Sequence, residues 1–157
     1  MQRLFPLLAH ACLATLATAA LAQHPLARTP TPPDILVKGR WNGVDLERRS
    51  GCTRPENEGS RGTYAQFDVS TDATGVFAIG QSGITGLNCN YVGRYQVAAH
   101  RLSAEGTYSC TDGKQGTFRT TSVRVRPTAL EVRLAIQLTG TETCAIDAIL
   151  GMARFEP

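Results

Sequence analysis

Hydrophobic and polar residues alternate along most of this chain with a period of two. The clearest run, 130–138, carries leucine, valine or isoleucine at every second position. Successive side chains of a β-strand point to opposite faces, so this pattern predicts strands with one buried and one solvent-facing side. Residues 145–153 could form a helix, but Gly151 and the β-rich surroundings favour a strand there as well.

Turn-forming residues interrupt the alternation at short, regular intervals. Asp112-Gly113 is the strongest hairpin signal, because a tight turn needs residues that accept positive φ. Short connections between all neighbours predict an all-β fold, an up-and-down antiparallel meander that closes into a small barrel and so loses its exposed edges. A two-layer β-sandwich is the alternative. We expect eight strands, at 36–46, 62–69, 75–79, 88–99, 106–111, 116–125, 130–138 and 143–154.

Residues 1–22 have the pattern of a secretory signal peptide. Arg3 precedes an apolar run that ends in Ala20-Leu21-Ala22, the small-x-small pattern that signal peptidase accepts. Pro6 and His10 interrupt that run, so a membrane anchor is the weaker interpretation. We expect a periplasmic or secreted protein, with no membrane span once the signal is cleaved.

Removal of the signal leaves a proline-rich flexible segment at 23–34 and one folded domain at 35–157. The formal net charge of +3 falls to +2 with the loss of Arg3. Such a balance indicates neither a nucleic-acid nor a membrane partner.

Cleavage would also remove Cys12, so that four cysteines remain. They are Cys52, Cys89, Cys110 and Cys144. An even number in a small exported chain predicts two disulfides, although four cysteines allow three pairings. A loose internal repeat between the two halves would favour one bridge per half, Cys52–Cys89 and Cys110–Cys144.

Gly39-Arg40-Trp41 on the first predicted strand, with Arg154 near the end of the last, resembles the G-x-W and late-arginine signature of lipocalin- and avidin-like (calycin-type) β-barrels. In those families the tryptophan closes one end of the barrel and the arginine packs across its ring. The resemblance therefore implies a cation–π stack of Arg154 on Trp41. Trp41 is the only tryptophan, whereas avidin-type biotin sites use several, so biotin is not the expected ligand.

Gly39-x-Trp41 followed by Cys52 is also similar to the small periplasmic inhibitors of secreted metalloproteases. Those proteins are compact eight-stranded barrels whose flexible N-terminal segment enters the protease cleft. The resemblance implies that Gln23 to Pro33 could act in the same way.

Catalytic and cofactor-binding patterns are sparse. Only His24 and His100 would survive processing, and Gly80-Gln81-Ser82-Gly83 misses the G-x-S-x-G elbow by one residue. The cysteines lack zinc-ligand spacing, and no glycine-rich phosphate loop precedes a helix. We therefore expect no catalytic residues, no metal and no cofactor. Acidic residues that could still meet in space to form a carboxylate site are Asp45, Glu47, Asp68, Asp72, Asp112 and Asp147.

Arginines are concentrated on two successive predicted strands. Their outward positions could gather them on one face, where like charges across a hairpin would favour an acidic partner. Isolated, solvated arginines that protect the sheet from aggregation are the simpler explanation. The residues are Arg119, Arg124, Arg126 and Arg133.

Together these patterns favour an exported, non-enzymatic binding protein of unknown target, with an inhibitor-like protein-binding module as one form of it. A carrier of a small apolar ligand inside the barrel is the second reading, but small barrels are usually filled by side chains. An enzyme with an unrecognised carboxylate site is the third, and unpaired buried carboxylates in a cleft would favour it.

Overall fold

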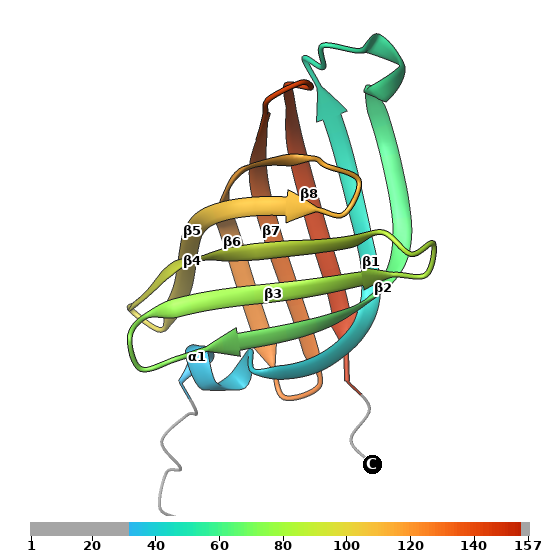
Figure 1. The fold of residues 1–157 in the computed structure, drawn as a ribbon. Coiled ribbons are helices and arrows are strands. Elements are labelled where there is room, and N and C mark those ends of the chain that lie inside the picture. The colour runs from blue at the N-terminus through green and yellow to red at the C-terminus, as the bar shows by residue number, and fades with distance from the viewer. Residues whose placement is uncertain (1–31, 155–157) are drawn as a thin grey trace, which may run out of the picture.

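The computed structural model describes residues 32–154 and shows eight antiparallel strands closed into a barrel (Figure 1). Each strand pairs with the next, and the first also pairs with the last, which confirms the up-and-down meander and rules out the sandwich. None of the helices in this part of the chain is long and apolar enough to cross a membrane. The elements are α1 (Pro33–Leu36), β1 (Gly39–Ser50), η1 (Pro55–Asn57), β2 (Gly59–Thr71), β3 (Val76–Gly83), β4 (Asn88–Ala98), β5 (Arg101–Cys110), β6 (Gln115–Arg126), β7 (Ala129–Thr139) and β8 (Cys144–Ala153).

The observed strands differ from the predicted ones at the start of β5, which begins at Arg101 instead of 106, and in β1 and β2, which pair as far as Arg49 opposite Gly59. Their hairpin extends beyond β3 at one end of the barrel, whereas β8 pairs with β1 as far as Ser50 (Figure 1). At the other end, α1 takes up the start of the expected first strand. Pro33 is buried in α1, and Thr71 donates a hydrogen bond to the Asp34 carbonyl at 2.7 Å, so residues 33 and 34, the end of the expected flexible segment, pack against the barrel. The predicted signal peptide at 1–22 and residues 23–31 lie outside the described residues.

The alternation along each strand fills the barrel interior with apolar side chains. In β7 the buried positions are the ones that the sequence pattern predicts, and β8 is a strand as expected. Trp41, Phe67, Phe77 and Tyr91 are fully buried. Trp41 lies at the end of the barrel nearest α1, whereas Tyr91 lies toward the opposite end, where its hydroxyl contacts Gln81. Burial of such large apolar rings is a main source of stability.

The barrel is sealed at its α1 end by Trp41 and Arg154. The Trp41 indole donates a hydrogen bond to the Val37 carbonyl at 2.9 Å, and the Arg154 guanidinium lies 4.3 Å above the indole ring. The same guanidinium donates to the carbonyls of Leu36, Lys38 and Pro127. This is the contact that the calycin resemblance implies, and we call this end the base.

Both disulfides lie at the opposite end, and their pairing corrects the one derived from the internal repeat. Cys89 bonds Cys110, and Cys52 bonds Cys144. Cys89 and Cys110 are direct partners in the β4–β5 register, with Cα atoms 4.0 Å apart. Cys52 reaches Cys144 because closure of the barrel sets the end of β1 beside the start of β8. The repeat pattern carries no information about that closure.

Candidate functional site

The end of the barrel opposite the base is polar, and it holds a pocket of about 290 Å³. We call it the mouth pocket. Its walls come from the upper parts of β1, β2, β3, β4 and β5 and from the β3–β4 and β5–β6 connections. Its polar lining includes Asp45, Glu47, Arg49, Gln81, Tyr108, Asp112 and Lys114.

The change from apolar base to polar mouth follows the inward face of single strands. On β1, Trp41 lies at the base, and Asp45 and Arg49 follow on the same buried face. On β3, the inward Phe77 is followed by Gln81. Period-two alternation therefore directs charged side chains into the barrel only near its mouth.

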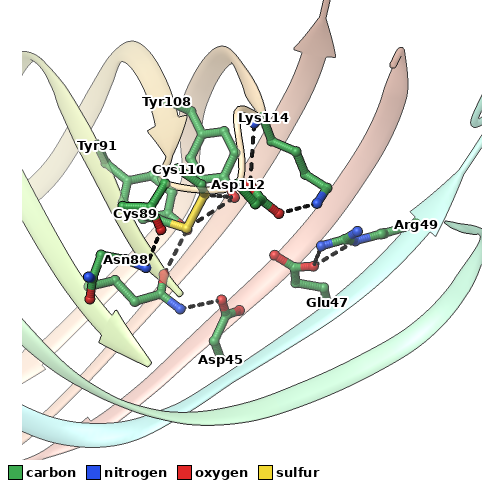
Figure 2. Close-up of a disulfide and its surroundings, with 12 residues drawn as sticks. Asp45, Glu47, Arg49, Asn88, Cys89, Tyr91, Tyr108, Cys110, Asp112 and Lys114 are labelled. Carbon is green, nitrogen blue, oxygen red and sulfur yellow. Dashed lines mark hydrogen bonds and ion pairs between the residues drawn. A yellow bond between two sulfur atoms is a disulfide. The ribbon is translucent and has the colours of Figure 1, made fainter. Parts of the chain in front are cut away.

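Asp45 is the central residue of the mouth pocket. Only 4% of it is exposed, and its Oδ2 accepts a hydrogen bond from Gln81 Nε2 at 2.8 Å. The Tyr91 hydroxyl donates to Gln81 Oε1 at 3.2 Å, which fixes the amide with its NH₂ group toward the carboxylate. Asp45 Oδ1 is buried and has no hydrogen-bond partner among residues 32–154. Figure 2 shows Asp45 and Glu47 beside each other, both extending from β1 into the pocket.

The pKa of Asp45 is raised from 3.8 to about 7. Burial is the largest cause, because it removes water from the charged form, and the Glu47 carboxylate adds like-charge repulsion. The hydrogen bond from Gln81 and the charge of Arg49 oppose the rise. A carboxyl group that titrates near neutral pH in a pocket is a frequent mark of a functional site.

Four other charged groups of the mouth pocket form two ion pairs, whereas Arg61 at its rim contacts neutral oxygen atoms. Arg49 binds Glu47 through Nε at 2.7 Å and through a second nitrogen at 2.5 Å. Lys114 binds Asp112 through its ammonium group and its backbone N–H (Figure 2). Burial works against ionisation of Asp112, but these Lys114 contacts hold the pKa of its carboxyl group below the usual value.

Tyr108 and the Cys89–Cys110 disulfide form one side of the pocket. The Tyr108 hydroxyl lies 2.7 Å from the Cys110 sulfur and 3.5 Å from the Cys89 sulfur, and its ring centroid is 5.0 Å from that of Tyr91. Burial raises the pKa of both tyrosines, so both hydroxyls remain protonated. This wall is therefore a fixed set of neutral donors beside a covalent cross-link.

The structure brings together three of the six acidic residues that the sequence singles out. Asp45, Glu47 and Asp112 line the mouth pocket. Asp68 is exposed and pairs with Arg40 at 3.2 Å on the outer surface. The other two also lie elsewhere. Asp72 accepts backbone N–H groups in the β2–β3 turn, and Asp147 is exposed on β8.

Within residues 32–154, the histidine and cysteine residues offer no free imidazole or thiol to this site. His100 is exposed in the β4–β5 turn, with φ of 60°, and His24 lies outside the described residues. The ligand atoms of Cys52, Glu142 and Cys144 lie within 4.8 Å of one another, but the two cysteines form a disulfide and offer no thiolate. Of the segment Gly80 to Gly83, which differs from the G-x-S-x-G motif by one residue, Gln81 lines the mouth pocket.

The predicted arginine surface lies on β6 and β7, but its charges are arranged differently. Arg124 lies opposite Glu131 in the strand register, and the Glu131 carboxylate is 2.9 Å from Arg133 and 3.8 Å from Arg124. The expectation of like charges facing each other is therefore wrong for these two. Arg119 lies opposite Ala135 and Arg126 opposite Ala129, and an acidic partner for this surface remains a prediction.

Comparisons with known proteins do not assign the chain to a family. No family model matches it, and no curated protein matches it. A solved structure with some similarity is a de novo designed, fluorescence-activating β-barrel, with 14% identity, a TM-score of 0.42, and coverage of 78% of this chain and 99% of that one. The fold assignment rests on the strand pairing rather than on this low similarity.

Proposed function

We propose that this protein is an exported, non-enzymatic binding protein of the calycin type that holds a small polar molecule in its mouth pocket. The observation that carries the proposal is Asp45, a buried carboxylate that lines the pocket and keeps one oxygen without a partner in the described chain. An unsatisfied buried polar group costs about 1–3 kcal/mol, and more when it is charged. A ligand with a hydrogen-bond donor would remove that cost.

A polar ligand fits this barrel better than an apolar one. Aromatic and aliphatic side chains fill the base, whereas the mouth pocket is lined by charged residues. Its volume of about 290 Å³ is close to the lower end of the roughly 300–1,000 Å³ usual for small-molecule sites. These features favour a small ligand near the mouth over an apolar molecule deep in the interior.

Export and calycin-type ancestry are further parts of the proposal. The signal-peptide pattern of residues 1–22 and the two disulfides support an oxidising compartment. The stack of Arg154 on Trp41 supports the calycin resemblance. An inhibitor-like role for the Gln23–Pro33 segment draws support from the sequence alone, because nearly all of that segment lies outside the described residues.

The proposal can be tested by NMR with the purified, disulfide-bonded protein and a set of small polar compounds at millimolar concentration. We expect some of them to shift the backbone amide signals around Asp45, Gln81 and Tyr108, and Asp45→Asn to change which compounds bind. Asp68→Asn is the matched control, because Asp68 is an exposed acid on the outer surface. If no compound moves these signals, the pocket is not a binding site. If they move identically in the Asp45 variant, Asp45 takes no part in binding and the observation that carries the proposal is overturned.

An acid–base enzyme is the second candidate, and the pKa of Asp45 is the observation that favours it. A carboxyl group with a pKa of about 7 can both give and take a proton at neutral pH, which general acid–base catalysis requires. The two functions separate after prolonged incubation of a bound compound with the protein. Recovery of the compound unchanged supports binding, whereas conversion that Asp45→Asn abolishes would establish an enzyme.

A further inference from the structure

The charged side chains inside the mouth pocket form two ion pairs and leave Asp45 without a counter-ion, while Arg61 at the rim contacts the neutral Glu56 carbonyl and Asn57 Oδ1. Glu47 is held by Arg49 and Asp112 by Lys114, so each of these pairs is close to neutral. Asp45 has an amide as its neighbour instead of a cation. When Asp45 is ionised, the pocket therefore contains a single negative charge that the surrounding groups do not pair.

We propose that Asp45 is the counter-ion for a ligand that carries one positively charged N–H group, such as a primary or secondary ammonium. The inference rests on the proposed binding function and names the class of ligand. An ammonium N–H bound to Asp45 Oδ1 would supply the missing hydrogen bond and the missing charge together. Charge-assisted hydrogen bonds of this kind are roughly twice as strong as neutral ones.

The positions of the neighbouring groups favour an ammonium over a metal ion or an anion. Calcium needs six to eight oxygen ligands and magnesium a near-octahedral set. Here Asp45 offers one free oxygen, and Glu47 is already engaged by Arg49. Tyr91 donates to Gln81, and Gln81 donates to the Asp45 carboxylate, so these hydrogen bonds stabilise the ionised form of Asp45. The ionised carboxylate would repel a negatively charged ligand.

The nearby cations are held away from Asp45 by their own partners. Arg49 is turned to Glu47, and Arg61, at the rim of the pocket, donates to the Glu56 carbonyl at 3.3 Å and to Asn57 Oδ1 at 3.2 Å. Within residues 32–154, the groups that face Asp45 across the pocket from β3, β4 and β5 are Gln81, Tyr91 and Tyr108. All three are neutral at physiological pH.

A proton and an ammonium would compete for the same carboxylate. Ammonium binding requires ionised Asp45, so its affinity should fall about tenfold for each pH unit below the pKa of the free protein. Bound ammonium should in turn lower the pKa of Asp45, because the nearby opposite charge favours the ionised form. Neutral ligands should show neither effect.

The test compares matched probes by NMR titration at pH 8 and pH 5.5. Butylammonium and benzylammonium are paired with the neutral n-butanol and benzyl alcohol, and butyrate serves as the anion. We expect at least one ammonium probe to shift the amide signals around Asp45 and Gln81 with an affinity at least tenfold higher than its neutral partner at pH 8, and to lose that advantage at pH 5.5. Asp45→Asn should abolish the preference, and Asp68→Asn should keep it.

Two results overturn the inference. One is that the alcohols or butyrate bind the mouth pocket as tightly as the ammonium probes. The other is that no ammonium probe binds there. The binding function survives either result if other compounds of the polar set still occupy the pocket, and it falls only if none does. The carboxyl ¹³C signal of Asp45 in the unmodified protein gives an independent readout, because an ammonium must lower its pKa even if the variant fails to fold.

Discussion

Replacing Asp45 with asparagine should stabilise the protein, and the gain should grow with pH. Asp45 is buried, and its folded-state pKa of about 7 lies above the value of 3.8 expected in the unfolded chain. The folded state therefore resists ionisation, whereas the unfolded state does not. Asparagine keeps the shape and can accept the hydrogen bond from Gln81, but it carries no charge to desolvate.

The magnitude follows from the two pKa values. At 1.36 kcal/mol per tenfold change, ionisation of Asp45 above pH 7 costs the folded state about 4 kcal/mol. Below pH 3.8 both states are protonated and the cost is absent. Between pH 3.8 and pH 7 the cost of ionising Asp45 rises by about 1.4 kcal/mol per pH unit. The stability that the folded state gains from protonated Asp45 is therefore complete below pH 3.8 and is lost as the pH rises through 7. For a domain of this size, 4 kcal/mol corresponds to a rise in Tm of about 10–15 °C.

The assay is urea unfolding of the disulfide-bonded protein at pH 4, 6 and 8, followed by the fluorescence of Trp41, the only tryptophan. Asp45→Asn and the unmodified protein should have similar unfolding free energies at pH 4 and should differ by about 4 kcal/mol at pH 8. Asp68→Asn should stay close to the unmodified protein, because Asp68 belongs to an exposed ion pair. A difference for Asp45→Asn that does not change with pH would refute the assignment of Asp45 as a buried, uncompensated acid.

Three further predictions concern the scaffold and can be checked by the same unfolding assay. Arg154→Met should cost about 3 kcal/mol, because it removes three hydrogen bonds to carbonyl groups and the cation–π contact with Trp41. Arg133→Met, on the outer surface, should cost less than about 1 kcal/mol. Equal effects of the two changes would contradict a role of Arg154 in sealing the base. Removing the Cys52–Cys144 bridge, which joins residues 92 apart, should destabilise the protein by roughly 1 kcal/mol more than removing the Cys89–Cys110 bridge, which joins residues 21 apart. The larger loop costs the unfolded chain more entropy, so the reverse order would show that this entropy does not determine the loss of stability. Gly93→Ala should cost about 3 kcal/mol, because its new Cβ would lie 1.9 Å from the Glu105 carbonyl oxygen. Gly151→Ala is the control and should be tolerated, because its Cβ would lie 3.6 Å from the nearest atom. A stable Gly93→Ala protein would contradict the close approach of these two strands.

The barrel could be predicted from the sequence because its main signals are local. Alternation in 130–138 and the Asp112-Gly113 turn each depend on a few neighbouring residues, and so do the other strands and turns of the meander. The disulfide pairing could not be predicted, because Cys52 and Cys144 meet only once β1 and β8 pair. Long-range closure leaves no trace in local composition.

The mouth pocket was only partly accessible from sequence. Asp45 follows Trp41 by four residues, so period two already places it on the inward face of the same strand. That signal was sufficient to find a charged residue inside the barrel. Its unpaired oxygen could not be foreseen, since this depends on Gln81 from another strand and on the pairing of Glu47 with Arg49. The contact of Glu131 with Arg124 likewise depends on the β6–β7 register, whereas Arg133 lies two residues from Glu131 on the same strand.

The closing seam between β1 and β8 bears on how the protein is made. Residues 42–50 pair with 145–153, so the first strand finds its second neighbour only after nearly the whole chain is available. Contacts between residues this distant in sequence form slowly, because the chain loses the entropy of a long loop before the new contacts stabilise it. Until then β1 has one partner strand and the barrel an open edge. The barrel therefore closes only after β8 is available, so β8, the last strand of the chain to be made, completes the fold.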